Sequence, residues 1–306
     1  MTDQGFPAER IDTSRPHPAR MYDYYLGGRD NYEVDRHAAE EVLRFAPSTR
    51  VTALANRAFM RRAVRAVVGA GVRQIIDIGT GIPTSPNPHE IAREIDPAAR
   101  VAFVDNDVIV ATHADAKLAG ESGTAFVHAD LRDPRSILES PALRDLIDFG
   151  EPVALMLVAV LHFVEDAADP AGIVAALGEG LPSGSHLILS HVTADFHGGE
   201  QEIARRDDPG VGARKVYERT AAAVTLRDRN GVARFFEGWD LLEPGLVQAS
   251  AWRPELEPED AGHDAAEAED GTFQDAPGAA DAQDGAGIRA GFDDVAALYA
   301  GVARKP

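Results

Sequence analysis

The stretch RQIIDIGTGIPTSPN, residues 73–87, decides the fold. It contains an apolar strand with an acid near its end, a turn with two glycines one residue apart, and two prolines where a helix is expected. A strand, a glycine turn and a helix in this order commonly bring a cofactor close to the backbone. The ligand of such a turn can be a dinucleotide, a nucleoside triphosphate or another adenosine cofactor, and a tight turn can also bind nothing.

Apolar runs alternate with helical patterns along most of the chain. Besides residues 73–79, strands are predicted at 100–107, 124–130, 152–163 and 185–192. Helical patterns lie between them at 87–95, 107–119 and 169–180, and two longer ones come first, at 31–46 and 51–71. Strands that are apolar throughout and alternate with helices predict an α/β fold, with a mostly parallel sheet covered by helices on both faces.

Composition excludes several classes of protein. The chain has 306 residues, a formal net charge of −20 and no cysteine. Disulfides, thiolate metal sites and a cysteine nucleophile are therefore excluded, which fits a soluble cytoplasmic protein. The sequence shows no apolar run of membrane-spanning length, no signal-peptide core and no basic stripe for nucleic acid. We expect neither a membrane nor a nucleic acid as partner, and a monomer or a homodimer.

Residues 255–290 form an acidic insertion. No Lys or Arg lies between Arg253 and Arg289, and more than half of the net charge falls there. The segment is rich in Ala, Gly and Pro and cannot bury enough apolar surface to offset its ordering entropy. We expect a disordered loop at the tip of a hairpin between strands at 245–254 and 297–306. An acidic interaction arm is the alternative.

The glycine turn disfavours a phosphate ligand. The pattern G-x-G-x-x-T at 79–84 lacks the third glycine of the dinucleotide motif, and the two prolines delay the next helix to about Pro88. A pyrophosphate needs the free amides of a helix that begins directly after the turn. Asp77 would also repel it. No Gly-Lys-Ser/Thr follows, so the phosphate-loop alternative fails as well.

S-adenosylmethionine fits this turn better, because it carries an adenosine and two positive charges but no phosphate. Asp77 is expected to hold its ammonium group, Asp105 both ribose hydroxyls, and Asp130 the adenine amino group. Acids at the carboxyl ends of three successive strands are hard to explain by sheet packing, although each alone could cap a turn. The predicted cofactor-binding residues here are Asp77, Gly79, Thr80, Gly81, Asp105, Asn106, Asp130 and Leu131, the last against the adenine ring.

These residues lie in a pattern that resembles a known family. The strings RPHPARMYDYYLGGRDNYEVDR, IDIGTGIPTSPNPHEIAR, VDND, ADLRDP, VALMLVAVLHFVED and LILSHVTAD are similar to the bacterial S-adenosyl methyltransferase family long labelled a domain of unknown function. The similarity covers residues 12–254 and resumes near Leu298. It implies the class I methyltransferase fold, a Rossmann-like seven-stranded sheet whose last strand is antiparallel, with S-adenosylmethionine as ligand. It does not identify the acceptor, and the acidic insertion departs from the family pattern.

The N-terminal string RMYDYYLGGRDNYEVD contains four of the six tyrosines of the chain. We predict that residues 1–70 form a helical cap on a core of residues 71–306. The cap is either a packed helix followed by a Gly-Gly turn or a lid on the cofactor. As a lid it would contribute Arg20, Met21, Tyr22 and Tyr25, with Arg20 on the methionine carboxylate.

Methyl transfer needs alignment of the acceptor, and a base only where the acceptor must lose a proton. His162 and His191 follow predicted strands and are the candidate catalytic bases, although histidines at strand ends often only bond to backbone. The His191–Asp195 pair is thin evidence for a metal, and we predict none. The sequence thus predicts methyl transfer to a small-molecule acceptor. Alternatives are a non-catalytic cofactor-binding regulator and, less favoured, a nicotinamide-dependent oxidoreductase.

Overall fold

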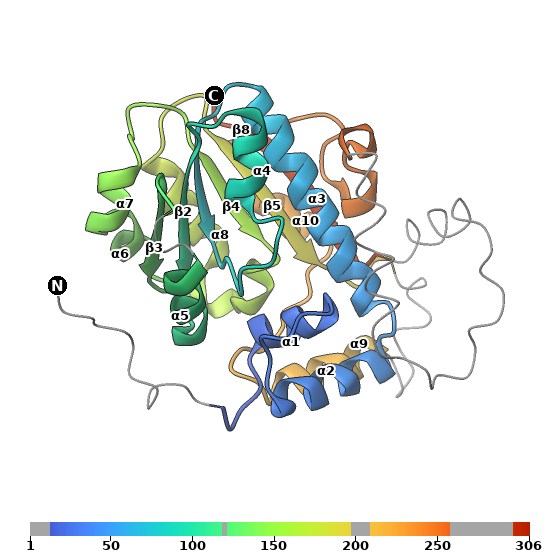
Figure 1. Ribbon diagram of the computed structural model, residues 1–306. Helices are drawn as coiled ribbons and strands as arrows, with labels where there is room; N and C mark the ends of the chain where they lie inside the picture. Colours follow the sequence, from blue (N-terminus) through green and yellow to red (C-terminus); the bar gives the residue numbers. More distant parts are fainter. Residues whose placement is uncertain (1–12, 118–120, 197–208, 258–295) are drawn as a thin grey trace.

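Figure 1 shows the computed structural model, which describes residues 13–117, 121–196, 209–257 and 296–306. The described strands form one sheet in the order β3-β2-β1-β4-β5-β8-β6, with β7 also paired to β8. Strands β1 to β5 are parallel, and β8 is antiparallel to β5. The bounds are β1 (Gln74–Ile78), β2 (Arg100–Asp105), β3 (Thr124–His128), β4 (Ala154–Val158), β5 (His186–Val192), β6 (Asp240–Leu241), β7 (Val247–Gln248) and β8 (Leu298–Arg304).

The edge beyond β8 differs in detail from the expected strand. Since β5 pairs with one edge of β8 along its whole length, the short strands β6 and β7 share the other edge. The sheet therefore has seven strand positions, as the class I fold implies. Of the strand predicted at 245–254, only β7 forms, because the chain then enters the 3-10 helix η5 (Ala249–Ala251). Arg62 donates to the carbonyl oxygens of Ala249 and Trp252 and so holds this helix in place.

Helices cover both faces of the sheet, as predicted. Ile75 on β1 faces a core shared with α3 (Thr49–Gly69) and α4 (Pro88–Ile95). Ile76 faces the opposite core, as successive residues of a strand do. This second core is closed by α6 (Pro134–Leu138), α7 (Pro141–Leu146), α8 (Pro170–Glu179) and α10 (Arg229–Ala233). The helix α5 (Val108–Lys117) follows β2 and contacts β3.

A separate helical group lies at the carboxyl ends of the strands. It consists of α1 (Pro18–Tyr25), α2 (Glu33–Phe45) and α9 (Pro209–Tyr217), which lie side by side at the bottom of Figure 1. We call these three helices the cap. Their apolar core contains Met21, Tyr25, Val42 and Val216 and is distinct from the cores of the sheet. The cap therefore includes α9, a helix from far along the chain, whereas α3, which was predicted as part of the cap, packs on the sheet. A domain boundary at residue 70 stays a prediction.

The acidic insertion predicted at 255–290 lies almost entirely outside the described residues. On either side of it, β7 and β8 pair antiparallel, with Val247 opposite Ala300. The predicted hairpin is thus present as a short pair of strands. Within the described part of the chain, every helix is too short or too polar to cross a bilayer.

Candidate functional site

The glycine turn follows β1 directly and uses both of its glycines. Gly79 has φ +75° and Gly81 has φ +67°, in the left-handed region that favours glycine. Gly79 also donates to the carbonyl oxygen of Val104 on β2 (2.8 Å), and a Cβ there would collide with Val160. At Gly81 a Cβ would meet nothing within 4 Å. Gly79 is therefore required by packing, while the space at Gly81 is open to a ligand.

Asp77 lies on β1 just before this turn and is 6% exposed. Burial raises the pKa of its carboxyl group to about 6, and this effect outweighs the Thr80 side chain and the Arg57 guanidinium, which both favour the charged form. A bound cation would remove this penalty. The position and electrostatics of Asp77 therefore suit a ligand ammonium group.

Asp105 ends β2 and fixes the glycine turn. Its Oδ2 accepts from the Gly81 amide (2.9 Å) and its Oδ1 accepts from the Asp107 amide (2.9 Å). Burial raises the pKa of this carboxyl group, because it is desolvated more than these two bonds compensate. Asp105, which is predicted to hold the ribose, thus also fixes the position of Gly81, the glycine with open space beside it.

Asp130, after β3, is bound mainly by its neighbours. Arg132 makes two side-chain bonds to it, which lowers the pKa of the Asp130 carboxyl group to about 2. Asn106 donates to it as well (3.3 Å), which brings together the residues that follow β2 and β3. Leu131 is buried in the core of the sheet. The contacts predicted for Asp130 and Leu131 with an adenine stay predictions.

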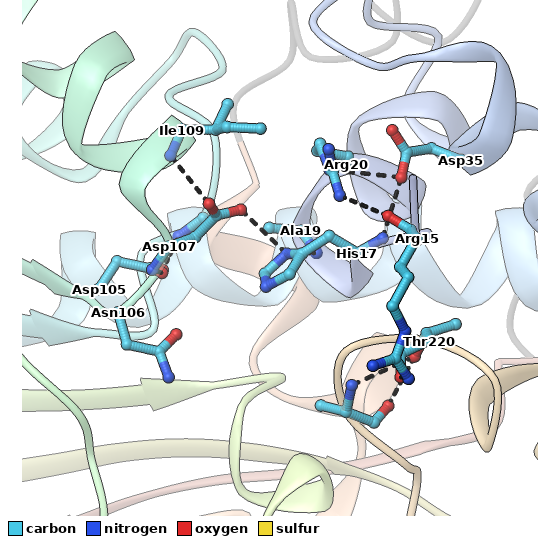
Figure 2. A network of polar contacts seen from close by, with 12 residues as sticks. Arg15, His17, Ala19, Arg20, Asp35, Asp105, Asn106, Asp107, Ile109 and Thr220 are labelled. Carbon is cyan, nitrogen blue, oxygen red and sulfur yellow. Dashed lines mark hydrogen bonds and ion pairs between the residues drawn. The ribbon is translucent and has the colours of Figure 1, made fainter. Parts of the chain in front are cut away.

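Figure 2 shows how the start of α1 reaches the end of β2. The Nδ1 atom of His17 accepts from the Ala19 amide (3.3 Å) and lies 3.0 Å from Oδ2 of Asp107, two residues after Asp105. Arg20 lies 3.3 Å from Asp35 at the start of α2 and also donates to the Arg15 carbonyl oxygen. Arg20 is 2% exposed. Its predicted contact with the methionine carboxylate would compete with Asp35.

Of the other three predicted lid residues, Met21 and Tyr25 point into the packing of the cap, and the Tyr22 hydroxyl reaches α3. Met21 has no exposed surface, so a direct contact with the cofactor would need the cap to move. The Tyr22 hydroxyl donates to the Ala53 carbonyl oxygen, and the Tyr25 hydroxyl lies 3.2 Å from that of Tyr217 on α9. In this structure the tyrosines join the cap to α3 and join its helices to one another.

His191 is fully bonded. The Arg227 guanidinium, always a donor, lies 2.8 Å from Nε2, so Nε2 accepts and the ring proton sits on Nδ1, which donates to the Val192 carbonyl oxygen. Burial lowers the pKa of His191 to about 4. Since neither ring nitrogen is available, the geometry argues against His191 as a base and for a role in positioning Arg227.

His162 differs from His191. It lies in the 3-10 helix η2 (Leu161–Phe163) after β4, where the strand predicted to reach residue 163 stops at Val158. Its Nδ1 is buried and makes no hydrogen bond among the described residues. Burial holds the pKa of His162 well below its usual value, with His191 and Arg227 adding to the effect, so the ring is neutral. Of the two predicted bases, His162 is the one with a ring nitrogen that has no hydrogen-bond partner among the described residues; a catalytic role of either stays a prediction.

Sequence reasoning missed four polar residues that the fold brings to this region. They come from segments far apart in the chain, so local motifs could not assign them. A readable signal existed for one, since an arginine at position 57 interrupts the apolar stripe of a predicted helix. The four are His17, Arg57, Asp107 and Arg227.

The strand order, the glycine turn and the acids at the strand ends define a class I, Rossmann-like S-adenosylmethionine-dependent methyltransferase fold. The site fits that cofactor, because its acids attract a cation and Gly81 opens onto free space. The chain belongs to the S-adenosyl methyltransferase family, whose model matches residues 4–306. S-adenosylmethionine is thus the cofactor of its family, which sets aside the nicotinamide alternative.

Two crystal structures are similar over nearly the whole chain. One is a DUF574 family protein from Streptomyces avermitilis, 41% identical, with 97% of this chain and 100% of the other covered and a TM-score of 0.78. The second is a Thermobifida fusca protein assigned as a methyltransferase, 31% identical, with 98% of each chain covered and a TM-score of 0.77. Among curated proteins, none matches this chain.

Proposed function

We propose that this protein transfers a methyl group from S-adenosylmethionine to a small-molecule acceptor, in the cytoplasm. The observation that carries the proposal is the arrangement of Asp77 and Asp105 around a glycine turn with open space at Gly81. Burying two carboxyl groups destabilises their ionised forms and raises their pKa values, and a cationic adenosine ligand would offset this desolvation.

The chain's own residues bind and orient the cofactor in this proposal. Asp77 takes the ammonium group, the backbone of 79–81 lies along the ligand, and Asp105 with Asn106 takes the ribose. Asp130 and Leu131 meet the adenine. When bound, the cofactor supplies a methyl group already activated by a sulfonium. The protein then has to align an acceptor in line with it and exclude water.

His162 is the residue we assign to proton acceptance. The ring is neutral, and its Nδ1 makes no hydrogen bond among the described residues, so this nitrogen can accept a proton. The low pKa also makes His162 a weak base, which suits an acceptor whose departing proton is acidic. The ring of Phe163 lies 4.4 Å from it, and Tyr217 of the cap lies 6.0 Å from Phe163. We place the acceptor against these aromatic rings. A net charge of −20 supports a small molecule over a nucleic acid.

Binding of the cofactor is the first test. Calorimetric titration should show binding of S-adenosylmethionine and S-adenosylhomocysteine and none of NAD. Asp105→Asn should lower the affinity for both adenosyl ligands by about tenfold or more, since it removes a charge that holds Gly81. Asp96→Asn, at the end of α4 ahead of that strand, is the control and should leave the affinity unchanged. Failure of the unaltered protein to bind either adenosyl ligand would refute the proposal.

The acceptor class is tested with S-adenosylmethionine carrying a labelled methyl group. A cell extract separated into small-molecule, protein and nucleic-acid fractions is offered to the protein. We expect label in the small-molecule fraction, and less of it with His162→Gln. Label in a macromolecular fraction would contradict the acceptor class. Tight binding with no transfer to any fraction would favour the non-catalytic regulator.

A further inference from the structure

Arg57 brings a positive charge from α3 to the glycine-turn loop. It occupies the stripe of α3 that otherwise packs on the core through residues such as Met60 and Val64. Its Nη2 atom donates to the carbonyl oxygens of Thr84 (2.7 Å) and Pro86 (2.8 Å). Among the described residues, no carboxylate forms an ion pair with it. Asp77 and Glu90 attract the half-buried guanidinium from a distance, while its hydrogen bonds among the described residues go to carbonyl groups, which position it without pairing its charge.

The proline-rich loop explains how this arginine is held. A carbonyl group inside an α-helix accepts from the amide four residues on, so it has little capacity left for a side chain. The prolines at 83 and 86 keep the segment out of helix, and α4 begins only at Pro88, with Asn87 and Glu90 forming its capping box. The carbonyl groups of Thr84 and Pro86 are thus free to hold Arg57. The late start of α4, which disfavours a pyrophosphate ligand, therefore also leaves two carbonyl groups that can bind Arg57.

Asp77 lies near Arg57 without contacting it. The two charges attract each other, and the attraction is one of the influences that lower the pKa of Asp77. They nevertheless form no direct ion pair in the described structure. Asp77 lies just before the glycine turn, and Arg57 is held on the loop just after it. A negative and a positive group that are close but not paired are complementary to an amino acid, whose ammonium and carboxylate are joined to one carbon.

We propose that Arg57 binds the α-carboxylate of the methionyl end of the cofactor, opposite Asp77, which binds the ammonium group. This inference rests on the proposed function and assigns a residue within the same site. It replaces Arg20, whose guanidinium lies against Asp35 in the cap. A planar guanidinium held at one nitrogen presents its other donors in a fixed orientation, which suits a carboxylate.

The test compares ligands that differ in the carboxylate alone. The probes are S-adenosylhomocysteine and its decarboxylated form, 5′-deoxy-5′-(3-aminopropylthio)adenosine, titrated by calorimetry. The unaltered protein should bind S-adenosylhomocysteine about tenfold or more tightly than the decarboxylated form. In Arg57→Gln this preference should disappear, with the affinity for the decarboxylated form nearly unchanged. Arg57→Lys, which keeps the charge but not the fork, should retain part of it.

Arg61→Gln is the matched control. It removes an arginine one turn further along α3, which pairs with Glu257, and should leave the preference intact. Equal losses for both ligands in Arg57→Gln would show that Arg57 only supports the loop and would overturn the inference. If that variant does not fold, an unaltered protein with no preference between the ligands overturns it equally. Failure of the proposed function looks different, because then neither ligand binds at all.

Discussion

At the scale of the residue, Asp77 is the group whose charge depends most on what is bound. With a pKa of about 6 it is largely ionised at pH 7 and largely protonated at pH 5. A cation beside it favours the ionised form, so binding below pH 6 must release a proton. Asp105 also has a raised pKa, but its predicted ligand is a pair of neutral hydroxyls, which leaves Asp77 as the main source of this coupling.

We predict that the affinity for S-adenosylmethionine rises with pH up to about 6 and is flat above it. Below pH 6 each further unit should cost up to about tenfold, because the proton must first be removed from Asp77. Calorimetry in buffers of different ionisation enthalpy measures the proton released. Asp77→Asn should bind more weakly and without this pH dependence. The same slope in that variant would assign the coupling to another group.

The contribution of Asp77 to the free energy of unfolding of the ligand-free protein depends on pH in the opposite direction from the ligand affinity. Because the native pKa of Asp77 lies above its unfolded value of 3.8, the native state binds more protons between about pH 4 and 6. This group therefore stabilises the ligand-free protein at low pH, and the contribution is lost as pH rises through 6. At neutral pH the buried, ionised carboxyl group of Asp77 destabilises the ligand-free protein. A bound cation removes this destabilisation, so the same group contributes to the ligand affinity.

At the scale of the element, what the sequence predicts depends on how local the cause is. The start of α4 follows from neighbouring residues, Asn87 and Glu90, and was correctly predicted. The alternation of strands and helices was also predicted, because burial on both faces leaves continuous apolar runs. The partners of Arg57 and of Arg227 lie far away in the chain, and only the packed sheet brings them together. No local pattern encodes those contacts.

The connection between α1 and α2 shows how a motif can have a structural cause. Asp23, 4% exposed, accepts from the Asp30 amide (2.9 Å) and from the Asn31 side chain (2.7 Å). Gly28 lies directly against this carboxylate, and a Cβ there would overlap it. Gly28 of the Gly-Gly turn is thus explained by packing around one buried acid, and Gly27 by its φ of +79°.

We predict that Gly28→Ala destabilises the protein by about 1–3 kcal/mol, because Asp23 must move and give up its bonds to the loop. Urea unfolding measures the change. Gly69→Ala is the matched control, since Gly69 ends α3 and a Cβ there meets nothing within 4 Å. It should be neutral or stabilising by up to about 1 kcal/mol through helix propensity. Equal effects of the two substitutions would refute the role of Asp23.

At the scale of the whole molecule, a chain of hydrogen bonds fastens the cap to the sheet. The Tyr22 hydroxyl on α1 accepts from Asn56 on α3 (2.8 Å), and Asn56 accepts from the Ser190 hydroxyl on β5 (2.6 Å). Ser190 in turn accepts from the Ala159 amide after β4 (2.9 Å). The cap is thus bonded to β5 and to the residue after β4, and His17 at its start lies 3.0 Å from Asp107 after β2. Its position and that of the site are set together.

We predict that Tyr22→Phe destabilises the protein by about 1–3 kcal/mol, because it leaves the buried side chain of Asn56 without an acceptor. Tyr24→Phe, two residues along the same helix, removes a hydroxyl that bonds to Glu40 at the surface and should change stability by no more than about 0.5 kcal/mol. Urea unfolding separates the two. If the cap closes the site, Tyr22→Phe should also speed release of S-adenosylhomocysteine, measured by stopped flow, while Tyr24→Phe should not. Loss of stability with an unchanged release rate would make the cap a structural support that does not gate the cofactor.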